Sequence, residues 1–237
     1  MKRSIGVFDS GIGGLTILDE LKKVLPHESF IYYKDSKNNP YGEKAEKEIY
    51  DIVKGIVEYL ISLDVKLIVI ACNTATTRCM KKLRKEFPQM IFVGTVPAIK
   101  VATDNGFKNT LVMATPSTIT SERTNELIHD NKKENHQIRL LECYGLANAI
   151  EKNDNDLIHN ILTNIFKDYV NEDIDSIVLG CTHYPLIKDK INEIFPRALL
   201  IDSAPGVAKE VKNQLIKNNI YNEVGEQSIR IIDSENI

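Results

Sequence analysis

Two cysteines occupy the same kind of position in this sequence. Cys72 ends the apolar run LIVIAC, and Cys181 ends the similar run SIVLGC. The positions directly after them carry amide, hydroxyl and imidazole groups: Asn73, Thr74, Thr182 and His183. A thiol has an unperturbed pKa of about 8.5, so near neutral pH it can act as a proton donor or, as a thiolate, as a base. Each of the two cysteines could therefore be a core filler, a metal ligand, half of a disulfide or a catalyst.

The metal and disulfide interpretations find little support. The four cysteines stand at positions 72, 79, 143 and 181, so none of them forms the C-x-x-C pair that is typical of structural zinc sites. The first residues, MKRSIGVFDSG, reach a carboxylate before any apolar stretch could form a signal-peptide core, and no run approaches the length of a membrane span. We therefore expect a cytoplasmic protein with reduced cysteines and no metal.

The cysteines divide into two pairs. Cys79 and Cys143 fit the common role of free cysteine as a small buried hydrophobe. Cys72 and Cys181 instead follow predicted strands, where an α/β fold exposes polar groups to a ligand.

Asp9 and His183 are placed to assist these two thiols. Asp9 follows the apolar run SIGVF and could exchange a proton with Cys72 if their strands are neighbours. His183 stands two residues beyond Cys181 and could do the same there. Asp9 also fits a helix cap, and His183 a structural loop histidine; these interpretations are compatible with the catalytic ones.

The glycine-rich turn DSGIGG (9–14) matches no nucleotide motif. It contains G-x-G-G rather than G-x-G-x-x-G, and no G-K-[ST] follows it, so the dinucleotide and P-loop interpretations are weak. Its glycines could still let backbone amides approach an anion such as a carboxylate.

The remaining polar groups favour a small charged ligand that is held by hydrogen bonds. Within these motifs no lysine occurs, and Arg78 is the nearest cation. A Schiff-base cofactor would need a lysine, so we expect none of that kind. A small polyanion or zwitterion fits such a site. The neutral donors are Ser10, Asn73, Thr74, Thr76, Thr115, Ser117, Thr118 and Thr182.

Apolar runs alternate with helical patterns along the whole chain. At 237 residues with 43% hydrophobic residues, the protein can bury a large core, and its formal net charge of −3 gives no reason to expect nucleic acid or a membrane as a partner. The segment 44–64 has the apolar spacing of a surface helix. The runs predict buried strands of mostly parallel sheets, and hence an α/β fold, at 4–8, 30–33, 67–71, 91–94, 110–114, 138–142, 176–180 and 198–201.

A weak internal duplication predicts two lobes. The segment VKLIVIACNTATT aligns with IDSIVLGCTHYPL, and PYG (40–42) pairs less securely with CYG (143–145). Gly/Pro-containing crossings occur at 94–98 and 202–208. We therefore predict a discontinuous first lobe, 1–96 plus 206–237, and a second lobe, 97–205, with the site in the cleft between them.

Two thiols at facing strand ends suggest inversion at a tetrahedral carbon. One thiol would remove a proton from the carbon while the other returns a proton to the opposite face. The rival interpretation is a nucleophilic cysteine with His183 as its base, which leaves the second cysteine unexplained. A binding module without turnover is a third possibility, but binding alone gives no reason for two opposed thiols.

Four motifs in this order closely resemble the glutamate racemases: GVFDSGIGGLT (6–16), NPYGEK (39–44), ACNTAT (71–76) and GCTHYPL (180–186). Aspartate racemases share the paired cysteines, so racemisation of aspartate or another acidic amino acid is the alternative activity. The resemblance implies a cofactor-independent enzyme with two pseudo-symmetric α/β lobes, often a homodimer, that supplies D-glutamate for bacterial peptidoglycan.

The resemblance also implies roles for individual residues. Cys72 and Cys181 match the two acid/base cysteines, and Asp9 and His183 match the assisting positions. The substrate-binding positions implied by the resemblance are Ser10, Tyr41, Gly42, Asn73, Thr74, Thr182 and His183, to which we add Asp9 and Thr118.

Two segments depart from the family pattern. TPSTITSERT (115–124) has Ser117 in place of a glycine and Glu122-Arg123-Thr124 in place of small and aromatic residues. CYGLANAIE (143–151) lacks the family's prolines. Both segments fall where the second lobe would line the pocket or a dimer face, so they bear on substrate preference and assembly rather than on reaction type.

Overall fold

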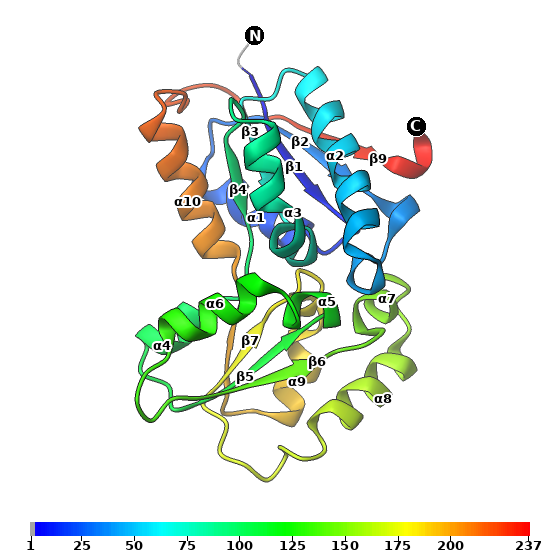
Figure 1. Ribbon diagram of the computed structural model, residues 1–237, viewed down its shortest axis with the longest axis vertical. Helices are drawn as coiled ribbons and strands as arrows, with labels where there is room; N and C mark the ends of the chain where they lie inside the picture. The colour runs from blue at the N-terminus through cyan, green and yellow to red at the C-terminus, as the bar shows by residue number, and fades with distance from the viewer. Residues whose placement is uncertain (1–2) are drawn as a thin grey trace.

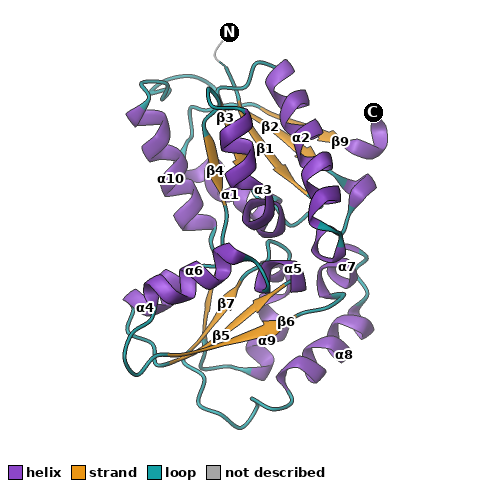
Figure 2. Ribbon diagram, in the orientation of Figure 1, coloured by secondary structure: helices purple, strands orange, loops and turns teal. Residues whose placement is uncertain are grey.

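The computed structural model describes residues 3–237 and contains two parallel sheets, each with helices on both faces (Figures 1 and 2). The first sheet has the order β4-β3-β1-β2-β9, with β1 (Ile5–Asp9), β2 (Phe30–Lys34), β3 (Leu67–Ile70), β4 (Phe92–Gly94) and β9 (Ile229–Asp233). The second has the order β6-β5-β7-β8, with β5 (Asn109–Ala114), β6 (Gln137–Glu142), β7 (Ser176–Leu179) and β8 (Leu199–Ile201). The predicted α/β class with parallel sheets is confirmed.

All eight predicted strands are present, each within one residue of its expected bounds. The ninth, β9, was missed by the sequence pattern; it pairs in parallel with β2 from near the end of the chain. Burial on both faces is correct for β1 and β3 but wrong for β6 and β8. These two are edge strands, as is the exposed β9, and charged side chains such as Arg139 and Arg230 are typical of exposed edges.

Helices cover both faces of the first sheet. The predicted helix at 44–64 is α2 (Glu46–Ser62), whose apolar stripe of Ile49, Val53, Ile56, Val57 and Leu60 is buried. It packs with α3 (Asn73–Glu86) against one face. On the other face, α1 (Leu15–Val24) packs against α10 (Ala204–Lys217).

The second sheet is covered in the same way. One face carries α4 (Ile99–Asp104) and α6 (Glu122–Asn131), next to the single turn α5 (Pro116–Ile119). The other carries α7 (Leu146–Glu151), α8 (Asn155–Phe166) and α9 (Lys188–Ile194). The 3-10 turns are η1 (Ser36–Asn38), η2 (Tyr41–Glu43), η3 (Tyr184–Ile187) and η4 (Ser234–Asn236). No helix within residues 3–237 has the length and apolar character needed to cross a membrane.

The chain passes between the two sheets at two places. It leaves the first sheet after β4 and returns from β8 into α10, which packs on α1 (Figure 1). The two crossings are joined by a hydrogen bond of 2.6 Å between the hydroxyls of Thr95 and Ser203. The lobe boundaries at 96/97 and 205/206 stay a prediction, and α10 begins just before the second of them.

Candidate active site

A narrow cavity is lined by loops from both sheets, at the carboxyl ends of the strands, as expected for a ligand site in parallel sheets. Its volume is about 10 Å³, roughly the room that one water molecule needs, so this closed arrangement has no room for an amino acid. The lining residues are Ser10, Asn39, Pro40, Tyr41, Gly42, Cys72, Asn73, Thr74, Thr115, Ala147, Cys181, Thr182 and His183. Of the predicted site residues, Asp9 and Thr118 lie behind this lining.

Cys72 lies in a buried and anionic environment. It caps α3, its Sγ accepting from the amide of Ala75 at 3.5 Å, and the hydroxyl of Ser10 is 3.9 Å from the sulfur. Burial, followed by the negative charge of Asp9, raises the pKa of the Cys72 thiol well above its ordinary value. Cys72 is therefore a protonated thiol at neutral pH and a candidate proton donor.

Cys181 lies beside a positive charge instead. Its Sγ is 3.8 Å from Nδ1 of His183, whose Nε2 is 2.6 Å from Oε2 of Glu151. Burial alone would lower the pKa of His183, but the contacts with Cys181 and Glu151 outweigh it and raise that pKa to about 10. At neutral pH the imidazole is therefore charged, and it places a cation beside the sulfur of Cys181.

Asp9 connects the lobes rather than capping a helix. The helix α1 begins after Gly14 with no side-chain cap, and Oδ1 of Asp9 accepts from the amide of Gly11 at 2.9 Å. Its Oδ2 accepts from the hydroxyl of Thr182 at 3.0 Å, across the lobe interface. Burial raises the pKa of Asp9, whereas His183 opposes this shift.

Glu151, the last residue of α7, belongs to the site and was missed from the sequence. Its carboxylate accepts from the backbone amide of Ile12 at 3.1 and 3.2 Å and also contacts His183. The carboxylate of Glu151, from the second lobe, is thus the anion that binds a backbone amide of the glycine-rich turn. Although burial opposes it, His183 lowers the pKa of Glu151. Its sequence signal is faint: one acid ends the otherwise apolar and amide segment LANAIE.

Two glycines of the DSGIGG turn let the lobes approach closely. A Cβ atom on Gly13 would lie 2.6 Å from both Nδ1 of His183 and Oγ1 of Thr182. One on Gly11 would lie 2.5 Å from Oε2 of Glu151. The turn is therefore a contact surface for the second lobe and not a phosphate cradle.

Replacing Gly13 with alanine should prevent this close approach and lower kcat/KM by about 10²-fold or more, since catalysis depends on the placement of groups within about 1 Å. Gly55→Ala is the matched control, because nothing lies within 4 Å of a Cβ there and the residue is inside α2. It should raise the free energy of unfolding by about 0.5–1 kcal/mol without affecting activity. Steady-state kinetics and urea denaturation measure both; unchanged kinetics for Gly13→Ala would contradict the contact.

Asn73 has the clearest signature of a ligand-binding side chain. It is 3% exposed, yet neither Oδ1 nor Nδ2 has a hydrogen-bond partner among the described residues. Buried polar atoms are nearly always paired, so a donor and an acceptor left together at a cavity fit a zwitterionic ligand.

Tyr41 and Gly42 bring a third loop to the cavity. The hydroxyl of Tyr41 donates to the buried carboxylate of Asp35. Gly42 packs against Thr115, whose Cβ would lie 2.8 Å from a Cβ on the glycine. This loop therefore contributes mainly backbone and ring surface to the site.

Three threonines form one wall of the site. Oγ1 of Thr74 is 3.0 Å from that of Thr115 and 3.3 Å from that of Thr118. The hydroxyl of Thr118 thus reaches the cavity only through the other two. Thr76 and Ser117, named among the neutral donors, lie outside the lining: Thr76 donates to the carbonyl of Ile70, and Ser117 contacts Arg78.

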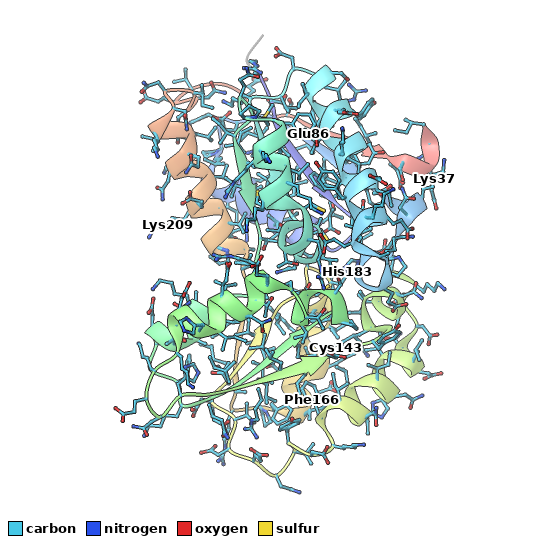
Figure 3. All side chains as sticks on the ribbon, in the orientation of Figure 1. Lys37, Glu86, Cys143, Phe166, His183 and Lys209 are labelled. Atoms are coloured by element: carbon cyan, nitrogen blue, oxygen red, sulfur yellow. The ribbon has the colours of Figure 1, made fainter. Side chains whose placement is uncertain are left out.

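Cys79 and Cys143 lie in apolar clusters, one in each lobe, as expected for core cysteines. Burial raises the pKa of both thiols to about 12. Figure 3 shows Cys143 within the second lobe and His183 near the junction between the lobes. All four cysteines are free, and within residues 3–237 no three His, Cys, Asp or Glu side chains are placed to hold a metal ion.

The comparisons with known proteins agree with the resemblance seen in the motifs. Residues 15–211 match the model of the Asp/Glu/hydantoin racemase family. A glutamate racemase of Clostridium acetobutylicum is 38% identical over 234 residues, which cover 97% of this chain and 91% of that protein.

Solved structures give the same picture. A glutamate racemase of Bacillus anthracis aligns with a TM-score of 0.86 at 29% identity, covering 98% of this chain and 88% of that one. A glutamate racemase of Francisella tularensis, in complex with D-glutamate, aligns with a TM-score of 0.86 at 30% identity and the same coverage. The chain therefore belongs to the Asp/Glu/hydantoin racemase family, whose racemases are isomerases.

Proposed function

We propose that this protein interconverts L- and D-glutamate without a cofactor, with Cys72 and Cys181 as the two acid/base groups. The observation that carries the proposal is that two thiols from different lobes line one cavity. The surroundings of Cys72 raise its pKa and so favour its protonated form, whereas Cys181 lies beside the cation of His183. The glutamate racemases among the relatives and solved structures support the choice of substrate.

The reaction needs two proton transfers and no change of oxidation state. In one direction the Cys181 thiolate takes the Cα proton, and the Cys72 thiol gives its proton to the opposite face of the carbanion. The products are the inverted amino acid, a Cys181 thiol and a Cys72 thiolate; the reverse direction restores the first state. His183 stabilises the thiolate form of Cys181, while Asp9 disfavours the thiolate form of Cys72.

The substrate would be held by uncharged groups around Cα. Asn73 offers a free donor and a free acceptor, which suit a carboxylate and an ammonium group respectively. The hydroxyls and backbone amides that would complete the site belong to Ser10, Tyr41, Gly42, Thr74 and Thr182. Thr118 would act through Thr74 and Thr115, with Asp9 and His183 as charged neighbours.

The decisive experiment is proton NMR of L-glutamate with purified protein in D₂O and EDTA, without added cofactor. We expect the Cα proton signal to disappear as D-glutamate accumulates, measured by chiral chromatography. L-aspartate serves as the second substrate. Turnover of aspartate alone would replace the substrate in this proposal, and binding without exchange for either amino acid would overturn catalysis.

The resemblance adds further expectations to the proposal. The enzyme would be cytoplasmic, and its D-glutamate product would serve peptidoglycan synthesis. The protein would act as a homodimer, with neither nucleic acid nor membrane as a partner.

A further inference from the structure

Arg78 lies on α3 in the first lobe, but its hydrogen bonds go to the second lobe. Its Nε donates to Oγ of Ser117 at 3.0 Å, and its Nη2 donates to the carbonyl of Ser117 at 2.6 Å and to Oγ1 of Thr120 at 2.7 Å. The side chain is only 20% exposed. A guanidinium presents its donors in a rigid plane, so such a set of bonds fixes orientation as well as distance.

Arg78 binds helix α5, whose position depends on contacts with other parts of the protein. The helix α5 has only four residues, and a single turn has no stability of its own in water. Its N-cap Thr115 and its residue Thr118 contact Thr74, while Arg78 binds Ser117 within the turn and Thr120 at its C-terminal end. Thr74 and Arg78 are four residues apart on α3 and so share one face of that helix. Thr74 and Arg78 of α3 therefore both bind α5 of the second lobe.

These contacts between α3 and α5 are part of the candidate site. Thr74 and Thr115 both line the cavity, so a displacement of α5 moves part of its wall. The cavity is too small for an amino acid as it stands, so part of its wall has to move for substrate to bind, and the contact between Thr74 of α3 and Thr115 beside α5 is part of that wall. Contacts that stabilise the closed arrangement raise the apparent affinity for substrate, because only that arrangement presents the complete site.

The guanidinium is also supported from its own lobe. Its Nη1 is 3.7 Å from Oε2 of Glu46, and Oε1 of the same carboxylate accepts from Lys82 at 2.9 Å. On the other lobe, Ser117 accepts through both its hydroxyl and its carbonyl, so the Arg78–Ser117 contact depends in part on this side chain.

We propose that Arg78 is a positioning residue of the racemase: it draws α5 onto α3 as the lobes close and so completes the Thr74–Thr115 wall around the substrate. This inference rests on the proposed function. It predicts that loss of the guanidinium raises KM, through a smaller closed population, while kcat changes little once substrate has closed the lobes.

The test compares Arg78→Ala and Arg78→Lys with wild type in L-glutamate racemisation. We expect Arg78→Ala to raise KM about 10-fold or more with kcat within about threefold, because charge-assisted bonds are lost. The KM of Arg78→Lys should lie between those of wild type and Arg78→Ala, since an ammonium group cannot reproduce the planar set of donors of a guanidinium. Arg84→Ala is the matched control: this arginine of the same helix donates only to the carbonyl of Phe92 in its own lobe, and its loss should leave KM unchanged.

The outcomes separate this inference from the proposed function. An inactive wild type would contradict the function, whereas an active wild type with an unchanged KM in Arg78→Ala would overturn the role of Arg78 alone. An equal rise in KM for Arg84→Ala would also overturn it, by showing a general effect on α3. If Arg78→Ala does not fold, Arg78→Lys and Thr120→Val take its place, and an unchanged KM in both contradicts the inference.

Discussion

Replacing either Cys72 or Cys181 with serine should lower kcat for racemisation about 10³-fold or more. In the proposed mechanism each thiol supplies one of two proton transfers, and a positioned acid or base contributes about 10²–10⁴-fold. A serine hydroxyl keeps the shape of the site but is far too weak an acid to replace the thiol. Steady-state kinetics in both directions measure the loss. Cys79→Ala is the control, because that thiol lies in the core of the first lobe and should affect stability rather than turnover.

Isotope exchange gives the same variants a sharper test. In D₂O, a variant with one cysteine can still remove the Cα proton from the enantiomer that faces it and return a deuteron to the same face. Cys72→Ser and Cys181→Ser should therefore each exchange one enantiomer without inverting it, and the two should exchange opposite enantiomers. Exchange of the same enantiomer by both variants would contradict a cavity with opposed thiols. So would inversion by either variant.

The second large effect concerns His183 and its partner Glu151. His183→Asn should lower kcat/KM by about 10²-fold or more, because it removes the cation beside Cys181 at a buried site. Glu151→Gln should retain more activity, but its pH profile should change. Burial lowers the pKa of His183, but the contacts with Cys181 and then Glu151 raise it to about 10, so removal of the Glu151 carboxylate should move the alkaline limb of kcat/KM to lower pH.

The control for this profile is Glu43→Gln. Glu43 also crosses the lobe interface, where Oε1 accepts from the amide of Gly145 at 3.3 Å, but no described contact joins it to His183. The alkaline limb of kcat/KM for Glu43→Gln should match that of wild type. An unshifted limb in Glu151→Gln, or equal shifts in both variants, would contradict the role of Glu151.

The raised pKa of His183 also predicts how the free energy of unfolding changes with pH. Between about pH 6.5, the ordinary pKa of histidine, and pH 10, the folded protein holds a proton on His183 that the unfolded chain has lost. This contribution to the free energy of unfolding is complete below about pH 6.5 and disappears as the pH rises through 10. Glu151→Gln should therefore show a smaller decline in stability over this range in urea denaturation.

The sequence alone determined the fold class and the two thiols. Its short apolar runs are too apolar for exposed strands and too short for long helices, which is why eight strands are recovered almost to the residue. Strand ends in a parallel sheet fall at one edge, so Cys72, Cys181, Asp9 and His183 could be grouped before any coordinates existed. Only β9 was missed, because an exposed edge strand lacks the continuous apolar run.

The tertiary structure decided what the residues do to one another. Glu151 contacts His183 across 32 positions of sequence, and Asp9 reaches Thr182 across 173, so no local pattern could reveal either contact. The same holds for Arg78 and α5. Charge, burial and hydrogen bonding set the protonation state of a group, and these depend on how the two lobes pack. The sequence thus named the two thiols, whereas tertiary packing decided which charged groups surround each of them.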